Sequence, residues 1–513
     1  MSKSQLNIKN AWTVIGFILF VIFSFLLICN RAMLVLDNHD EHQFMASAYL
    51  FATRGLLPYR DYAYFHMPNL IFVYALIYKL TTYRLLYTRL FSIIFGTLTV
   101  TIMFVSTYYF FKKKKFLAQF SAALLAGLFL LANPLFVGTS GRAWNHDVPV
   151  VLTLFAALLY YHSRKFERPC LLVGISGGLL GLAIGTRLSF VTIIPAFLLT
   201  LKFHPSTKSS RDFWYLLLSF TLGGVVSMLP SIMLFGLAPK NFIFGNIEYA
   251  NLNTLYRVVS GWTVGMNKIK FMLQNIFPNN SNLVIFAALF VFILIPSWLE
   301  YKEKNSWEFS SLFFALLALF CIFGSFVPTP AFYQYFYAPI PFIILGSAYT
   351  ISRLKYRGTI HNIYLQFFAV LILFSSLINL NDIPLIRNSL NAKEIWFPYT
   401  VHWQAEEKIN LKLDSPRILT LNPIYAIEAN LEIYPEFATG PFAFRVAYLL
   451  NEQDRQDFNL IAPVDLENFL SKNKPGGIFV GRDHDLEIPL VQYAIEHGYR
   501  ELNFPGMFSL WVP

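Results

Sequence analysis

Three carboxylates stand close together in residues 37–41 (Asp-Asn-His-Asp-Glu). A carboxylate that takes a proton from a hydroxyl group acts as a general base. If one helix covers this segment, Asp37, Asp40 and Glu41 stand at positions i, i+3 and i+4 and share one face. Helix capping is the alternative, because acidic side chains also stabilise a helix N-terminus. The following stretch, which ends at Gly55, has the amphipathic pattern of a helix.

Two more polar segments interrupt apolar stretches. Residues 141–147 (GRAWNHD) carry Arg142 and Asp147 and lead directly into the apolar run VPVVLTLFAALL. Arg187 lies between two other apolar runs. An arginine there needs a partner or a water-filled cavity, unless its long side chain reaches the lipid headgroups. A guanidinium also matches the oxygens of a phosphate.

The composition indicates the class of protein to which these residues belong. Of 513 residues, 56% are hydrophobic and 13% are charged, and the mean hydropathy is +0.51. Soluble domains average about 25% charged residues. This excludes an ordinary soluble enzyme, a disordered chain and a small disulfide-built domain, and it indicates a multi-span membrane protein. The three cysteines lie in separate apolar runs, which favours buried packing over redox or metal chemistry.

The hydropathy pattern predicts eleven membrane spans. They cover residues 12–30, 86–111, 116–137, 147–162, 169–185, 188–202, 213–236, 283–299, 309–327, 334–352 and 361–379. The fifth and sixth of these are alternatively one broken element. The apolar run 67–81 is short for a span, so we expect an interfacial or re-entrant helix there.

Basic loops set the predicted orientation. With the N-terminus inside, the inner loops contain the four lysines 112–115 and several other short basic segments, as the positive-inside rule requires. All three polar segments then lie on the outer side. An odd number of spans also places residues 380–513 outside.

The C-terminal part differs from the rest of the chain in its charge and in its residue pattern. Residues 380–513 contain 18 acidic and 11 basic residues, although the whole chain has a formal charge of +11. The apolar runs 417–421 and 477–480 predict buried strands, and 487–497 predicts a helix that ends before Gly498. We expect a small α/β domain on the outer face.

Carboxylates and arginines at one bilayer surface suit sugar transfer from a lipid phosphate. A carboxylate deprotonates the acceptor hydroxyl. Fixed positive charge stabilises the phosphate as it leaves. A lipid-linked donor also accounts for an enzyme embedded in a membrane.

The segment Asp40–Leu70 resembles the first outer loop of the GT-C glycosyltransferases related to protein O-mannosyltransferases and lipid A aminoarabinose transferase. The resemblance rests on the Asp40-Glu41 pair that opens a helix, on a turn from Gly55 to Pro58, and on a His-Met-Pro segment at residues 66–68 that opens an apolar helix.

Three later motifs resemble the same superfamily in order and sidedness, over roughly residues 1–380. GRAWNHD is similar to its Arg…Asp loop through Arg142 and Asp147, and GLAIGTRLSF is similar to a segment in which lysine is commoner than Arg187. AFYQYFYAPIPF is similar to a tyrosine- and proline-containing segment and places Tyr333 and Tyr335 near the site.

The resemblance implies a mostly α, polytopic GT-C fold. Residues 1–379 would form the membrane glycosyltransferase domain, with the catalytic motif in the outer loop 31–85, and residues 380–513 would form the extracytoplasmic α/β domain. The implied activity is inverting transfer of a sugar, hexosyl or pentosyl, from a polyprenyl-phosphate donor to a hydroxyl of a lipid, glycan or protein. The expected location is the outer face of the cell (inner) membrane, and nucleic acid is not an expected partner.

The resemblance also implies roles for individual residues. Asp40 is the candidate general base, and Glu41 orients it, the acceptor or a cation. Asp37 and Asp147 are candidates for positioning the acceptor or an arginine. The candidates for donor binding are His66, Arg142, Arg187, Arg257, Tyr333 and Tyr335. We expect no metal site and no required cofactor, although a divalent cation remains possible because several histidines lie nearby.

Two other functions remain open at this stage. A transporter or flippase of a lipid-linked or anionic substrate would place ionisable residues near the bilayer midplane and often shows internal repeats. A catalytically inactive scaffold would use the outer domain to bind envelope partners. The enzyme interpretation requires residues 37–41, 142–147 and 187 to meet in one outward cavity.

Overall fold

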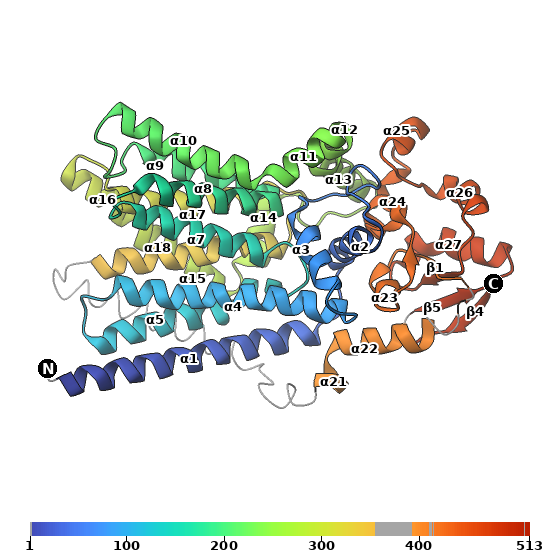
Figure 1. The fold of residues 1–513 in the computed structure, drawn as a ribbon, viewed down its shortest axis with the longest axis horizontal. Helices are drawn as coiled ribbons and strands as arrows, with labels where there is room; N and C mark the ends of the chain where they lie inside the picture. The colour runs from blue at the N-terminus through green and yellow to red at the C-terminus, as the bar shows by residue number, and fades with distance from the viewer. Residues whose placement is uncertain (1–2, 354–391, 410–412, 414, 507) are drawn as a thin grey trace.

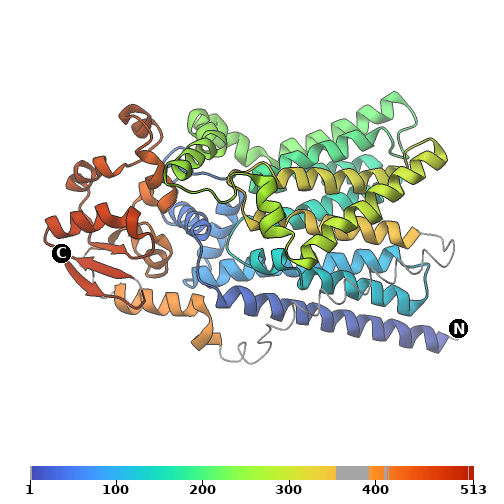
Figure 2. The same cartoon turned by 180° about the vertical axis from the view of Figure 1, so that it is seen from behind.

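The computed structural model describes all residues except 1–2, 354–391, 410–412, 414 and 507. Long helices lie side by side in a bundle, and the C-terminal part packs against one end of it (Figure 1). The view from behind shows the same division (Figure 2). The first half of the chain contains α1 (Lys3–Leu34), α2 (His39–Arg54), α3 (Asn69–Tyr78), α4 (Arg84–Phe110), α5 (Phe116–Leu131), α6 (Pro134–Thr139), α7 (Asp147–Ser163), α8 (Pro169–Thr186), η1 (Leu188–Ile193), α9 (Ile194–Leu201), α10 (Ser210–Ser227), α11 (Leu229–Leu237), α12 (Pro239–Ile243), η2 (Phe244–Glu248) and α13 (Tyr249–Val259).

The rest of the bundle and the C-terminal part follow. The bundle continues with α14 (Lys268–Phe271), η3 (Met272–Ile276), α15 (Asn280–Ala288), η4 (Leu289–Leu294), α16 (Ile295–Lys304), α17 (Phe309–Ser325), η5 (Tyr333–Phe336) and α18 (Pro339–Arg353). The C-terminal helices are α21 (Ala392–Ile395), α22 (Phe397–Gln404), η6 (Ala405–Ile409), α23 (Pro423–Glu428), η8 (Pro435–Phe437), α24 (Pro441–Ala447), α25 (Glu452–Asp457), η9 (Pro463–Asp465), α26 (Leu466–Lys472) and α27 (His484–Glu496).

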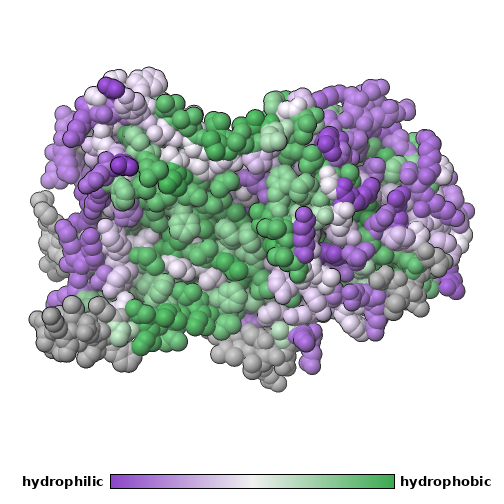
Figure 3. All heavy atoms as spheres, in the orientation of Figure 1, coloured by the Kyte–Doolittle hydropathy of each residue, from purple (hydrophilic) through white to green (hydrophobic). Residues whose placement is uncertain are grey.

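Within the described residues, four helical stretches are long and apolar enough to cross a bilayer, namely Thr13–Leu34, α4, α8 and the continuous stretch Asn280–Lys304. Helices α10 and α11 form a fifth if their 57° bend lies within one span. The helices α5, α7, α17 and η1–α9 are shorter but also apolar. An apolar band covers the bundle between two polar ends (Figure 3). The chain is therefore an integral membrane protein.

The predicted spans from 12–30 to 334–352 each overlap a helix of the bundle. The last predicted span, 361–379, lies outside the described residues, so the count of eleven stays a prediction. The run 67–81 forms only the ten-residue helix α3, which packs on α2 and α4 at the end near the C-terminal part. The loops after α4, α7, α9 and α16 lie at the opposite end (Figure 1).

Small residues allow two bundle helices to approach closely. A Cβ atom on Gly177 of α8 would lie 2.0 Å from the carbonyl oxygen of Phe220 in α10, and one on Gly181 would lie 2.7 Å from that of Gly224. Larger residues would force α8 and α10 apart. Tight packing of this kind holds helices together in lipid, where burial of apolar area adds little. It also fixes the end of α8, where Arg187 has an extended backbone between α8 and η1.

The C-terminal part contains a five-stranded sheet. Its strands are β1 (Arg417–Thr420), β2 (Glu432–Ile433), β3 (Gly477–Val480), β4 (Arg500–Asn503) and β5 (Ser509–Val512), in the spatial order β2-β1-β3-β5-β4. Strand β1 pairs in parallel with β2 and β3, whereas β5 runs antiparallel to β3 and β4. The strands predicted at 417–421 and 477–480 and the helix predicted at 487–497 are confirmed. The predicted boundary at 379/380 lies outside the described residues.

Apolar packing joins this sheet to the outer loops of the bundle. One buried cluster combines Phe44 of α2 and Tyr74 of α3 with Ile418 and Phe479 of the sheet. A second stacks Phe244 on Phe458, with ring centroids 3.8 Å apart. The C-terminal part therefore forms one wall around α2 and its carboxylates.

Candidate active site

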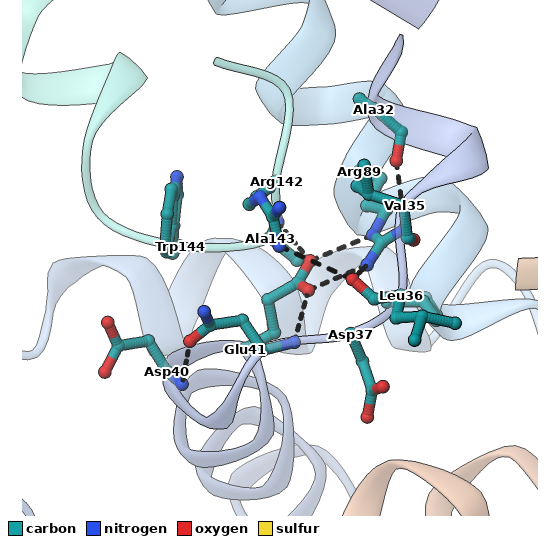
Figure 4. A network of polar contacts seen from close by, with 12 residues as sticks. Ala32, Val35, Leu36, Asp37, Asp40, Glu41, Arg89, Arg142, Ala143 and Trp144 are labelled. Atoms are coloured by element: carbon teal, nitrogen blue, oxygen red, sulfur yellow. Dashed lines mark hydrogen bonds and ion pairs between the residues drawn. The ribbon is translucent and has the colours of Figure 1, made fainter. Parts of the chain in front are cut away.

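Helix α2 begins at His39, two residues after Asp37, the first carboxylate of the predicted helix face. Asn38 is the N-cap: its side chain accepts a hydrogen bond from the backbone N–H of Asp40, at 3.0 Å, and its own N–H donates to the Glu41 carboxylate, also at 3.0 Å. This capping box satisfies free N–H groups of the first turn. Asp37 therefore precedes the helix, and the prediction that three carboxylates share one helix face is wrong. Figure 4 shows the three pointing in different directions.

The Glu41 carboxylate is hydrogen-bonded to several segments of the protein and holds them together. Both of its oxygens accept from the guanidinium of Arg89 in α4, at 2.9 and 2.7 Å, and one also accepts from the N–H of Ala143 at 2.8 Å. Arg89 donates to three carbonyl groups at the end of α1 as well. Burial disfavours the charge on Glu41, but Arg89 more than compensates and lowers the pKa of this carboxyl. This geometry favours a positioning role for Glu41 over contact with a substrate.

Asp37 connects the site to the C-terminal part. Its carboxylate lies 2.5 Å from Arg482, which also donates to the Asp37 carbonyl at 2.7 Å. The Nε2 atom of His42 lies 2.5 Å from the same carboxylate, while its Nδ1 accepts from the N–H of Ile424 at 3.3 Å. Burial raises the pKa of Asp37, but the charges of His42 and Arg482 outweigh it and lower the pKa overall. Asp37 thus stays ionised and anchors the start of α2, a position that does not favour contact with an acceptor.

Asp40 is the carboxylate left available. It is partly exposed, and among the described residues its oxygens have only a long contact of 3.4 Å with the Gln43 amide and no ion pair within 4 Å. Burial of the carboxyl raises its pKa, although Arg187, His39 and Arg445 lower it in part. A carboxylate with free oxygens and a raised pKa is able to accept a proton.

The loop 141–147 is folded around Asp147. One oxygen of its buried carboxylate accepts from the N–H of Gly141, at 2.8 Å, and the other accepts from the hydroxyl of Tyr337, at 3.1 Å. Gly141 has φ +87° and is crowded by Ala32, which favours glycine there. Asp147 therefore shapes the loop rather than facing the space beside Asp40.

Arg142 belongs to the charged groups around Glu41 and Arg89. Its guanidinium stands over the ring of Trp144, at 5.4 Å, and its only hydrogen bond to a described residue is a long contact of 3.4 Å with the carbonyl of Leu36. Figure 4 places it beside Glu41 and Arg89, away from the Asp40 carboxylate. The structure thus separates Arg142 from the other candidate donor-binding arginines.

Arg187 reaches the centre of the site from the break between α8 and η1. It donates to the Asn145 side chain at 3.0 Å and contacts the His146 ring at 3.0 Å, and its guanidinium stands 5.0 Å from the centre of the Tyr335 ring. It is half-buried and has no carboxylate within 4 Å in the described part of the chain. These contacts hold Arg187 inside the site, so the alternative of snorkelling to the headgroups is not favoured.

Two further arginines approach from outside the bundle core. Arg445 of α24 donates to the Tyr249 hydroxyl at 3.1 Å and to the Asn253 side chain at 2.6 Å. Arg257 of α13 stands over the ring of Phe332 at 5.2 Å. The Nε atoms of both are buried, and no described residue accepts their hydrogens. Arg187 and Arg445 lie close enough to Asp40 for their charges to lower its pKa, and Arg257 lies near Arg445 and Tyr335.

The remaining candidate residues, His66, Tyr333 and Tyr335, have different surroundings. The imidazole of His66 stacks on Phe44, with centroids 5.0 Å apart. Burial, with a smaller effect of the Arg187 charge, lowers the pKa of His66 to about 3, so the ring is neutral and does not attract a phosphate by charge. Tyr335 lies in the site under Arg187, whereas Tyr333 is half exposed and packs beside Phe271.

Three residues of the site were not predicted from the sequence. Arg89 did leave a signal, because an arginine inside the predicted span 86–111 requires a partner. Arg445 and Arg482 left none, because they lie in ordinary polar segments of the C-terminal part and come to the site only through the packing of that part on α2.

In the part of the chain that the structure describes, no three His, Cys, Asp or Glu side chains are placed to hold an ion. An accessory divalent cation stays a prediction.

Comparison with solved structures identifies the fold. ArnT from Cupriavidus metallidurans, solved in the apo state and bound to undecaprenyl phosphate, superposes with a TM-score of 0.57 over 98% of both chains, at 14% sequence identity. The archaeal oligosaccharyltransferase AglB from Archaeoglobus fulgidus, solved with an inhibitory peptide and a dolichol-phosphate, superposes with a TM-score of 0.51 at 12% identity, over 95% of this chain and 71% of that one. The chain has the GT-C fold.

The GT-C fold confirms the fold resemblance that the motifs indicated. No protein-family model matches the sequence, and no curated protein sequence matches it. At such low identity the likeness establishes the fold alone. The function must therefore be argued from the residues of the site.

Proposed function

We propose that this protein is an inverting membrane glycosyltransferase that moves a sugar from a polyprenyl-phosphate donor to a hydroxyl group. The observation that carries this proposal is the position of Asp40. It is a carboxylate with a raised pKa and no ion pair within 4 Å among the described residues, and the two arginines that act on its charge, Arg187 and Arg445, have no carboxylate partner within 4 Å there either. The GT-C fold supports the proposal, since ArnT was solved with undecaprenyl phosphate bound.

The reaction follows from these groups. Asp40 takes the proton of the acceptor O–H, and the oxygen attacks the anomeric carbon of the donor sugar from the side opposite the phosphate. The new C–O bond forms as the bond between the anomeric carbon and the phosphate oxygen breaks. The polyprenyl phosphate leaves with the electron pair, so the configuration inverts. The proton passes from Asp40 to solvent before the next cycle.

The arginines act on the leaving group. Negative charge grows on the phosphate as the glycosidic bond breaks, and Arg187, Arg257 and Arg445 place cationic donors around it. The unpaired Nε atoms of Arg257 and Arg445 fit phosphate oxygens as acceptors. Arg445 belongs to the C-terminal part, so that part contributes to the site directly.

The orientation completes the proposal. Basic loops lie at the end of the bundle opposite the site, and this supports a cytoplasmic N-terminus and a site on the outer face of the inner membrane. Lipid, glycan or protein hydroxyls are then the acceptors, and the sugar is a hexosyl or pentosyl group. The chemistry needs no cofactor.

The transporter alternative is less well supported. Transporters bind their substrates near the bilayer midplane, between repeats. Here the charged network gathers at one end of the bundle, between the helices and the C-terminal part (Figures 1 and 4). A scaffold would have no need for an unpaired carboxylate among arginines.

The experiment compares envelope lipids and glycans by mass spectrometry. Cells that lack the gene are complemented with the wild type or with Asp40→Asn, and the sugar-modified species lost on deletion identifies the product. We expect Asp40→Asn to lower transfer by about 10²–10⁴-fold, because the base is removed while the fold is kept. Asp485→Asn changes an exposed carboxylate outside the site and should transfer normally.

Folding is checked separately, by the amount of protein in the membrane and its thermal unfolding in detergent. Normal transfer by a well-folded Asp40→Asn variant would remove Asp40 as the base. Deletion without any change in envelope glycans or lipids would contradict the proposed function itself.

A further inference from the structure

A second cavity lies beside the cleft that holds Arg187. Its volume is about 430 Å³, in the range of about 300–1,000 Å³ typical of small-molecule sites. It lies between α6, the N-terminal end of α15 and η5, and it is lined by Pro134, Leu135, Gly138, Thr139, Trp144, Asn275, Asn279, Asn282, Tyr333 and Gln334. None of these lining residues carries a charge at neutral pH.

The cavity lies next to the proposed phosphate site and shares a lining residue with it. Gln334 lines both the cavity and the neighbouring cleft of Arg187, His146 and Tyr335. Trp144 lines the cavity, and its ring centroid lies 4.6 Å from that of His146, which contacts Arg187. In Figure 4 the Asp40 carboxylate is turned away from Glu41 and Arg89, toward the side of Trp144. A molecule in the cavity would therefore lie next to the residues that hold Arg187.

The walls offer hydrogen bonds that no described residue satisfies. Asn275 uses its Nδ2 on the carbonyl of Phe271, and Asn279 uses its Oδ1 on the N–H of Ser281. The Asn275 Oδ1, the Asn279 Nδ2, the side-chain amide of Gln334 and the hydroxyl of Tyr333 remain without a hydrogen-bond partner among the described residues. The lining residues thus offer both hydrogen-bond donors and acceptors, together with the aromatic rings of Trp144 and Tyr333.

The geometry points to this cavity as the site of the donor sugar, and its chemistry selects an uncharged sugar. This inference rests on the proposed function. Hydroxyl groups satisfy neutral amides, and the C–H face of a sugar ring packs on an aromatic ring. An amino sugar would need a carboxylate partner and an acidic sugar a cation, and neither lines the cavity. A prenyl chain would leave the amides unsatisfied, which costs free energy.

A glycine offers a way to fill the cavity. Gly138 of α6 lines it, and a Cβ atom on this residue would meet nothing within 4 Å. Gly138→Leu therefore adds a side chain to the cavity without a clash at its base. Gly236 in α11 has equally free surroundings but does not line the cavity, so Gly236→Leu is the matched control.

The experiment measures binding to the purified full-length protein in detergent. The probes are bare undecaprenyl phosphate, undecaprenyl phosphate glucose and mannose as neutral donors, and undecaprenyl phosphate 4-amino-4-deoxyarabinose as a charged donor. We expect at least one neutral donor to bind more tightly than the bare lipid phosphate. Gly138→Leu should weaken that donor about tenfold or more while the affinity for the bare lipid phosphate stays within about twofold. Gly236→Leu should change neither affinity.

A second variant tests the polar wall without filling the space. Asn275→Ala removes the free amide oxygen, and we expect the neutral donor to bind about fivefold more weakly, as for one lost hydrogen bond. Binding of the bare lipid phosphate should again be retained.

Several results would overturn the sugar site. One is equal binding of both neutral donors and the bare lipid phosphate to the wild type. Another is tighter binding of the amino-sugar donor than of either neutral one. If Gly138→Leu no longer binds the bare lipid phosphate, the cavity holds the prenyl chain instead of the sugar. If Gly138→Leu binds the donor as tightly as the wild type does, the cavity holds no part of the donor. If the wild type binds none of the lipid phosphates, the proposed function fails together with the sugar site.

Discussion

The two sides of the N-terminus of α2 use the same kinds of residue in opposite ways. On one side, which we call the frame, Asp37 and Glu41 are held by Arg482 and Arg89 at 2.5–2.9 Å. On the other, which we call the open side, Asp40 lies near Arg187 and Arg445 without an ion pair within 4 Å among the described residues. Neighbouring carboxylates in one segment thus have different surroundings.

The difference shows that the fold uses two carboxylates to position the backbone and leaves a third one able to act as a base. A paired, buried carboxylate is ionised and fixed, so it locates the backbone but cannot take a proton easily. A carboxylate with free oxygens keeps a raised pKa and can serve as a base. The frame connects α1, α2, α4, the 141–147 loop and the C-terminal part, and it thereby holds the open side in place.

Breaking the frame at its centre should have the largest effect on folding. Arg89→Met leaves the Glu41 carboxylate buried and unpaired, and we expect a loss of about 3–5 kcal/mol of stability, measured by thermal unfolding in detergent. Adding Glu41→Leu should restore part of that loss, because the buried charge is gone. Arg54→Met, at an exposed site on α2, should be nearly neutral. A stable Arg89→Met variant would show that the frame does not support the fold.

Breaking the open side should affect substrate binding instead. Arg187→Ala removes a guanidinium from the proposed phosphate site, and we expect the donor KM to rise about tenfold or more with little change in unfolding temperature. Arg187→Lys should retain part of the affinity, because the charge remains. Arg211→Ala, at the opposite end of the bundle, should behave as the wild type. An unchanged donor KM in Arg187→Ala would assign Arg187 to packing.

The connection between frame and open side can be tested at Arg482. Arg482→Gln removes the ion pair to Asp37, and we expect kcat to fall about fivefold to tenfold with an unchanged donor KM, because α2 is held less exactly. Arg482→Lys should restore part of kcat. Arg500→Gln changes an exposed arginine of β4 and serves as the control. A change in donor KM alone would mean that Arg482 does not act through Asp37.

The smallest expected effect is a shift in pH dependence. The base works in its deprotonated form, and burial raises the pKa of Asp40 above its ordinary value of 3.8. Activity should therefore fall on acidification at a higher pH than for a solvent-exposed Asp. Arg445 lowers this pKa, so Arg445→Gln should move the acidic limb of kcat/KM to higher pH by up to about one unit. A shift toward lower pH would contradict the placement of Arg445 beside Asp40.

The sequence by itself determined the bundle, most of its helices, the basic ends and the strands at 417–420 and 477–480. Hydropathy, charge asymmetry and residue pattern act over short stretches of chain, so they can be read without knowing the rest. The motifs also selected Asp40 and Arg187 as candidates. Only the tertiary structure decided that Glu41 pairs with Arg89, and that Arg445 and Arg482 come to the site from the far end of the chain. Those pairings join residues from 48 to 445 positions apart, and contacts at such separations exist only once packing has brought their elements together.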